Sequence, residues 1–144
     1  MGKTRKTKQM GQRANASLRA RQMSRVSKKK INTGVLSIHS TYNNTIVSLA
    51  DVSGNVVMSS SSGSLGFSGA KKGTPYAASK VGELIGEKAL QVGVKQVSVV
   101  VRGVGSGREA AIRGFISHGI DVSDLVDQTP VPFNGPRPKK ARRI

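Results

Sequence analysis

The distribution of charge along the chain constrains its fold more than any other feature. Of the 24 Lys and Arg residues, eleven lie in residues 1–30 and five in residues 129–144, and neither segment contains an acid. The middle, residues 31–128, holds eight basic and seven acidic residues. Segments of like charge without apolar periodicity bury too little surface to fold alone. We therefore expect one nearly neutral folded body, residues 31–128, between a basic N-terminal extension, 1–30, and a basic C-terminal tail, 129–144.

The formal net charge of +17 predicts a large polyanionic partner, for which nucleic acid is the natural choice. No apolar run approaches the roughly 18 residues that a membrane span needs. The chain has no Cys and only two His, so we expect no metal site, no cofactor and no small-molecule substrate. The acid-free composition of residues 1–30 fits an RNA-binding arm or an organellar targeting segment, and we favour the arm.

Three stretches rich in β-branched residues, 35–41, 45–51 and 56–61, predict strands. The connections at 42–44 and 53–55 are short and contain Asn or Gly, which tolerate tight turns. We therefore expect an antiparallel meander. A Ser- and Gly-rich loop follows, up to residue 73.

A helix is predicted from the Thr74-Pro75 start signal to about residue 92, with Gly93 as its stop. Its buried stripe is Ala77, Val81, Leu84, Ile85, Ala89 and Val92. Gly82 and Gly86 indicate close approach to another backbone.

A buried strand at 96–101 is reached through this helix and should run parallel to one of the first strands. A second helix should bury Ala111, Ile112, Phe115 and Ile116 and end at Gly119, before a last strand at 120–126. The prediction is a single α/β domain with a mixed five-stranded sheet and two helices, plus basic extended tails.

Two loops are candidate phosphate sites. Residues 103–107 form a glycine loop before a helix start, where backbone N–H groups and the helix dipole favour an anion; the alternative is a plain connector. Residues 64–73 combine small residues with Lys71 and Lys72, and Phe67 either stacks on an unpaired base or anchors the loop to the core. The C-terminal tail contains four prolines that keep its cations extended.

An enzyme of the two-metal nuclease type needs clustered carboxylates. The seven acids show no spacing that fixes such a cluster, and neither His39 nor His118 has a recognisable nucleophile partner. We therefore expect binding without catalysis.

Several segments together resemble the ribosomal small-subunit protein eleven family. The resemblance covers nearly all of residues 34–144 and is carried by residues 40–47, 66–69, 72–78, 103–109 with Arg113, and 127–143. It implies a ribonuclease H-like fold without its active site, binding to small-subunit rRNA on the platform near the messenger RNA exit site, and platform proteins as neighbours.

The resemblance and the residue patterns together give one set of predicted RNA contacts: Asn43, Asn44, Gly66, Phe67, Gly69, Lys71, Lys72, Arg102, Gly103, Gly105, Gly107, Arg108, Arg113, Asn134, Gly135, Arg137, Lys139, Lys140, Arg142 and Arg143. Departures from the family pattern at Ser68, Val104, Ser106, Phe133 and Pro136, with the long basic extension, favour an organellar ribosome, mitochondrial before plastid or bacterial. The competing hypothesis is a nucleic-acid binder outside the ribosome, such as a nucleoid protein or RNA chaperone.

Overall fold

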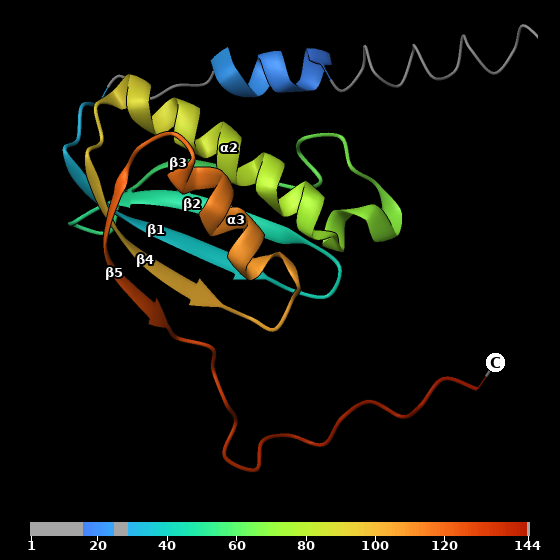
Figure 1. Cartoon of the computed structure of the whole chain (residues 1–144). Coiled ribbons are helices and arrows are strands. Elements are labelled where there is room, and N and C mark those ends of the chain that lie inside the picture. The colour runs from blue at the N-terminus through green and yellow to red at the C-terminus, as the bar shows by residue number, and fades with distance from the viewer. Residues whose placement is uncertain (1–15, 25–28, 144) are drawn as a thin grey trace, which may run out of the picture.

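All five strands that the sequence predicts are present in the computed structural model, which describes residues 16–24 and 29–143 (Figure 1). They form one sheet in the order β3-β2-β1-β4-β5. The strands are β1 (Thr33–Ser40), β2 (Thr45–Asp51), β3 (Val56–Ser61), β4 (Gln96–Arg102) and β5 (Asp121–Asp127).

The direction of each strand follows from the length of the connection before it. Short turns join β1 to β2 and β2 to β3, and both pairs are antiparallel. Helical crossovers precede β4 and β5, and the pairs β1–β4 and β4–β5 are parallel. The predicted meander and the predicted α/β class with a mixed five-stranded sheet are confirmed.

The helix α2 (Pro75–Val92) has the termini that its sequence signals predict. The Thr74 hydroxyl accepts a hydrogen bond from the Ala77 N–H at 3.3 Å, and Pro75 occupies the first helical position. Gly93 ends the helix with a φ of 93°. All six residues of the predicted apolar stripe are buried.

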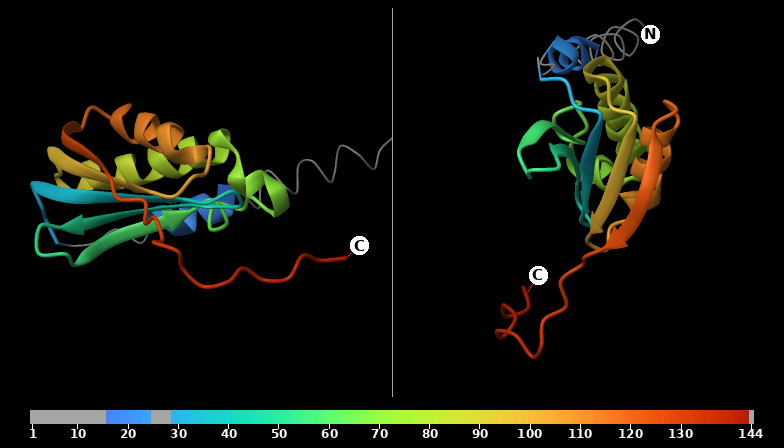
Figure 2. Two further views of the ribbon diagram at one scale, coloured as in Figure 1. Left: turned by 90° about the horizontal axis from the view of Figure 1, so that it is seen from below. Right: turned by 90° about the vertical axis from the view of Figure 1, so that its left-hand side faces the viewer.

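The second helix, α3 (Gly107–Ile116), lies on the same face of the sheet as α2 (Figure 2). Glycines allow the two helices to touch. A Cβ on Gly82 would lie 2.2 Å from the Ala111 carbonyl oxygen, and one on Gly114 would lie 2.4 Å from the Ser79 carbonyl oxygen. The predicted close approach at Gly82 is therefore confirmed, and Gly86 meets the His118 ring and the Phe115 carbonyl in the same way.

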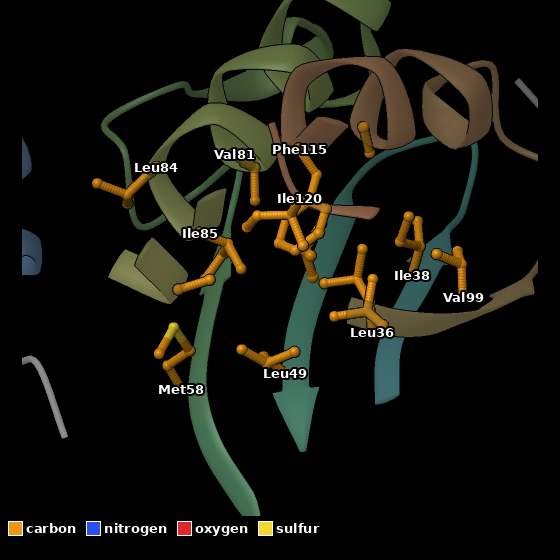
Figure 3. Packing of buried hydrophobic residues seen from close by; sticks show 14 of the residues in the cluster. Leu36, Ile38, Leu49, Met58, Val81, Leu84, Ile85, Val99, Phe115 and Ile120 are labelled. Carbon is orange, nitrogen blue, oxygen red and sulfur yellow. The ribbon is translucent and has the colours of Figure 1, made fainter. Parts of the chain in front are cut away.

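Between the helices and the sheet lies one apolar core (Figure 3). Leu36, Ile38, Leu49 and Val99 point up from the strands, and Val81, Leu84, Ile85 and Phe115 point down from the helices. Each of these eight side chains is fully buried. The core holds the strand ends in register and so fixes the loops that follow them.

The prediction for α3 was wrong in two details. Ile116 is 42% exposed because the helix ends there, and Ile112 is only partly buried. Gly119 adopts a φ of 78° in the turn beyond the helix, where its N–H donates to the Ile116 carbonyl at 2.8 Å.

The two-helix prediction also misses structure within the N-terminal extension and the loop before α2. Residues 16–24 are helical and lie beside α2 (Figure 1), with Arg19 paired to Glu87 at 2.9 Å and Met23 packed against the core. Residues Gly69–Gly73 form a short 3-10 helix, η1. The remainder of the predicted N-terminal arm, residues 1–15 and 25–28, lies outside the described residues. No helix in the described ranges is long and apolar enough to cross a membrane.

Candidate nucleic-acid interface

Most of the predicted RNA contacts in the body lie at one end of the sheet. Strands β1, β3, β4 and β5 all end there, so the segments that follow them, residues 41–44, 62–73, 103–106 and 128–129, emerge on the same side (Figure 1). The N-termini of α2 and α3 lie at this end too, since each helix begins directly after one of these segments. We call these four segments the loop edge. Ligands commonly bind at the carboxyl ends of strands in α/β sheets.

The turn at residues 41–44 is the centre of the loop edge. The Thr41 N–H donates to the Asn44 carbonyl at 2.9 Å, and the Asn44 N–H donates to the Thr41 hydroxyl at 3.1 Å. Asn43 is exposed, whereas the Asn44 side-chain oxygen is buried and has no hydrogen-bond partner among the described residues. The predicted pair of Asn residues therefore presents one exposed amide and one buried, unused acceptor.

The glycine loop at 103–106 packs on this turn and on the end of β1. A Cβ on Gly103 would lie 2.0 Å from the Ser40 carbonyl oxygen, and one on Gly105 would lie 2.3 Å from the Thr41 carbonyl oxygen. The Gly105 N–H donates to the Ser40 carbonyl at 3.0 Å. The close approach that these glycines allow is to the chain's own backbone, and their contact with phosphate stays a prediction.

Arg102 and Arg108 fasten the first residues of the tail to the glycine loop. The Arg108 guanidinium donates to the Gly103 carbonyl at 3.0 Å and to the Asp127 carboxylate, and Arg102 donates to the Gln128 side chain at 2.8 Å. Thr129 accepts from the Gly103 N–H at 3.2 Å. The tail therefore leaves the body from a fixed point.

Asp127 is the acid at the centre of this contact. The Thr129 hydroxyl and N–H donate to its carboxylate at 2.6 and 2.9 Å, and Arg108 donates to it as well. These bonds, those of Thr129 first, lower the pKa of Asp127 from 3.8 to about 2. The carboxylate is therefore ionised at neutral pH and holds Thr129, the first residue of the tail, by charge-assisted hydrogen bonds.

The loop before α2 contributes the cations of the loop edge. Lys71 and Lys72 lie in the last turn of η1, and neither makes an ion pair with another described residue. A Cβ on the following Gly73 would lie 2.2 Å from the Tyr42 carbonyl oxygen, so η1 abuts the central turn. The Ser106 hydroxyl donates to the Gly73 carbonyl at 3.0 Å and joins η1 to the glycine loop.

Phe67 is partly buried against the core and meets the Tyr76 ring edge to face, with ring centroids 6.1 Å apart. Of the two roles considered for Phe67, this packing is the anchoring one; base stacking by Phe67 stays a prediction. Gly66 has a φ of 94° and Gly69 a φ of 60°, so both glycines occur where the backbone turns.

Of the remaining predicted contacts, Gly107 begins α3 directly after the loop edge, whereas Arg113 and the tail residues lie away from it. Arg113 is in the last turn of α3, where it pairs with Glu109 at 3.4 Å in full solvent. The tail extends from the body as an exposed segment without regular secondary structure (Figure 1), and Asn134 within it has a φ of 55°. Its exposed residues include Arg137, Lys139, Lys140, Arg142 and Arg143.

Sequence reasoning missed Tyr76 and Lys80 at the start of α2. Tyr76 is 65% exposed, and the Lys80 ammonium lies 5.7 Å from its ring centroid. The sequence did contain a signal for this pair: an aromatic residue directly follows the Thr-Pro helix start, and a Lys follows it one helical turn later. In the described parts of the chain no three His, Cys, Asp or Glu residues are grouped as metal ligands.

A nearly neutral α/β body whose cationic loops and cationic tail lie at one end is typical of small proteins that bind nucleic acid. The match to known families makes this class specific: residues 34–143 match the model of ribosomal protein S11. The chain belongs to the ribosomal protein S11 family and is a protein of the small ribosomal subunit. The matched region contains the whole loop edge and nearly all of the tail, but not the helix at residues 16–24.

Proposed function

We propose that this chain is a structural constituent of the small-subunit platform that binds rRNA through the loop edge and the C-terminal tail. The observation that carries the proposal is the convergence of four chain segments at one end of the sheet, with the cationic tail fastened to the same end by Arg108 and Asp127. A rigid edge fixes position on an RNA surface, and an extended cationic tail adds affinity by neutralising phosphates.

The proposed contacts divide into two kinds. Lys71 and Lys72 on η1 meet the phosphate backbone beside the body, and the five cations of the tail follow an RNA strand away from it. Family membership supports neighbouring small-subunit proteins as further partners, and we place the chain near the messenger RNA exit site. The role is binding and not catalysis.

Sedimentation tests the proposal. Tagged chain expressed in its source cells should remain with the small subunit in sucrose gradients at high salt, because many contacts must break together before it dissociates. Loss of the chain from that peak would contradict the proposal and favour a nucleic-acid binder outside the ribosome. Chemical footprinting of the bound subunit then identifies the rRNA nucleotides protected by the chain.

We further propose a mitochondrial ribosome as the compartment. The support is the departure from the family pattern at Ser68, Phe133 and Pro136, together with the basic extension before residue 34 that the family model does not cover. Immunodetection should find the chain in small subunits from purified mitochondria. Its detection in plastid or bacterial-type cytoplasmic ribosomes instead would overturn this part of the proposal.

A further inference from the structure

A groove lies between the helix at residues 16–24, the loop before η1 and the start of α2. Its volume is about 550 Å³, and its lining residues are Ala16, Arg19, Leu65, Phe67, Tyr76 and Lys80. Sites for small ligands typically measure about 300 to 1,000 Å³. Two aromatic rings, apolar side chains and two cations therefore line a space large enough for a flat, negatively charged ligand.

Tyr76 offers the stacking surface of this groove. It is the second residue of α2 and is 65% exposed. Phe67 packs against it edge to face, at an interplanar angle of 85°, and is itself anchored on the core. The Tyr76 ring is thus supported from the protein side while much of it faces solvent, which is the arrangement that a base needs for stacking.

Two cations line the groove, and one of them, the Lys80 ammonium, lies over the Tyr76 ring at 5.7 Å from its centroid. Lys80, one helical turn after Tyr76, pairs with Glu83 at 2.8 Å, and Arg19 pairs with Glu87 at 2.9 Å. The carboxylates hold both cations beside the groove. An ammonium has three N–H donors and a guanidinium has five, so a phosphate can share each cation with its carboxylate.

We propose that this groove binds one unpaired nucleotide of RNA, with its base stacked on Tyr76 and its phosphate at Lys80 and Arg19. This inference rests on the proposed rRNA binding and names the chemistry that one part of the surface recognises. A nucleotide fits better than an uncharged aromatic ligand because two cations line the groove and because Lys71 and Lys72 lie in η1, shortly before α2. Arg19 lies outside the family match, so the site joins the family's body to this chain's own extension.

Tyrosine fluorescence reports on the groove directly. The chain has two Tyr and no Trp. Tyr42→Phe keeps an aromatic ring at the other position and leaves Tyr76 as the sole emitter. Titration with a single-stranded oligouridylate of about ten nucleotides, within the usual site size for single strands, should quench this emission as the complex forms. The same oligonucleotide in a duplex with oligoadenylate should leave the emission nearly unchanged.

Substitutions at Tyr76 give the second measurement. Tyr76→Leu should weaken binding of the single strand by roughly 5- to 150-fold, the usual range for loss of one stacked base. Tyr76→Phe retains the ring and should bind within about twofold of the wild type, since stacking needs only the π-face. Binding is measured at raised ionic strength, which weakens the phosphate contacts of the two basic terminal segments, so that stacking accounts for a larger share of the affinity. Circular dichroism of both variants checks that they fold.

Unquenched emission with a bound single strand, quenching that is equal for the duplex, or unchanged affinity of Tyr76→Leu would each overturn the groove proposal. None of these results affects sedimentation of the wild-type chain with the small subunit. Conversely, a chain absent from the subunit that still shows single-strand quenching would overturn the proposed function and leave the groove intact.

Discussion

Gly103 connects the fold to the loop edge, and replacing it tests that connection. It has a φ of 97°, and a Cβ would lie 2.0 Å from the Ser40 carbonyl oxygen. Gly103→Ala therefore carries two costs. The left-handed backbone costs an L-residue about 1–2 kcal/mol, and overpacking against a fixed backbone atom costs typically about 1–3 kcal/mol. The expected loss in the free energy of unfolding is about 2–5 kcal/mol.

Gly54→Ala is the matched control because Gly54 has a φ of 87° and nothing within 4 Å of its Cβ position. It shares the left-handed backbone and the unfolded-state effect of replacing Gly by Ala, but not the clash. Its expected cost is about 1–2 kcal/mol. The difference between the two variants, about 1–3 kcal/mol, measures the steric term alone.

Urea unfolding followed by circular dichroism gives both values. Binding to an rRNA fragment gives a second readout, because Gly103→Ala displaces the loop whose N–H contacts Thr129 and should weaken binding while Gly54→Ala does not. Equal destabilisation by the two substitutions would refute the reasoning, since it would mean that the glycine loop accommodates a Cβ at residue 103 without loss of stability.

The tail, the helix contact and Asp127 each allow a further test. Deleting residues 136–144 should weaken binding to an rRNA fragment and lower the slope of log affinity against log salt by about 0.7–0.9 for each phosphate that the tail no longer neutralises; an unchanged slope in a salt titration would show that the tail does not touch RNA. Gly82→Ala should destabilise the chain by up to about 2 kcal/mol in urea unfolding, because overpacking at the helix contact exceeds the gain of about 1 kcal/mol in helix propensity, and a net stabilisation would contradict this. Because the pKa of Asp127 is lowered in the folded state to about 2, its contribution to stability is fully present above about pH 4 and is lost as the pH falls towards 2; Asp127→Asn should flatten the stability profile in that window, and a wild-type slope in the variant would assign the effect to other carboxyl groups.

The sequence predicted those elements whose signals are local. The helix α2 has a cap, a proline, an apolar stripe and a terminal glycine within its own sequence, and both of its ends fall where these signals place them. The antiparallel pairs of the first three strands and the parallel pairing of β4 with β1 follow from connection lengths in the same way.

Elements stabilised by tertiary contacts were not predictable. Residues 16–24 contain only two large apolar residues, Leu18 and Met23, and this helix is held by contacts with α2 and the core. Lys88 is 1% exposed. It follows Leu84 by four residues, so it lies on the same side of α2 as the apolar stripe. It lines a groove together with Gln22 of the helix at residues 16–24. No periodicity reveals that a distant segment will pack beside such a position.

The candidate site shows the same limit. The sequence identified Gly103 and Gly105 as positions where something approaches the backbone closely, but the approaching group is the end of β1, which only the sheet register brings there. A glycine pattern in a sequence indicates that another group approaches the backbone closely, but it does not identify that group.

The way the loop edge is held together limits which groups are left for RNA. The N–H groups of Gly103 and Gly105 donate to Thr129 and Ser40, and Arg108 is engaged by Asp127. Among the described residues of the loop edge, Lys71 and Lys72 are the cations without an ion pair or a hydrogen-bonded side-chain partner. These internal contacts fix the edge and the origin of the tail, so under the proposed function we expect the phosphate contacts at η1, at the groove beside Tyr76 and along the tail. We therefore expect placement on the RNA and affinity for it to depend on different residues, so that substitutions can change one without the other.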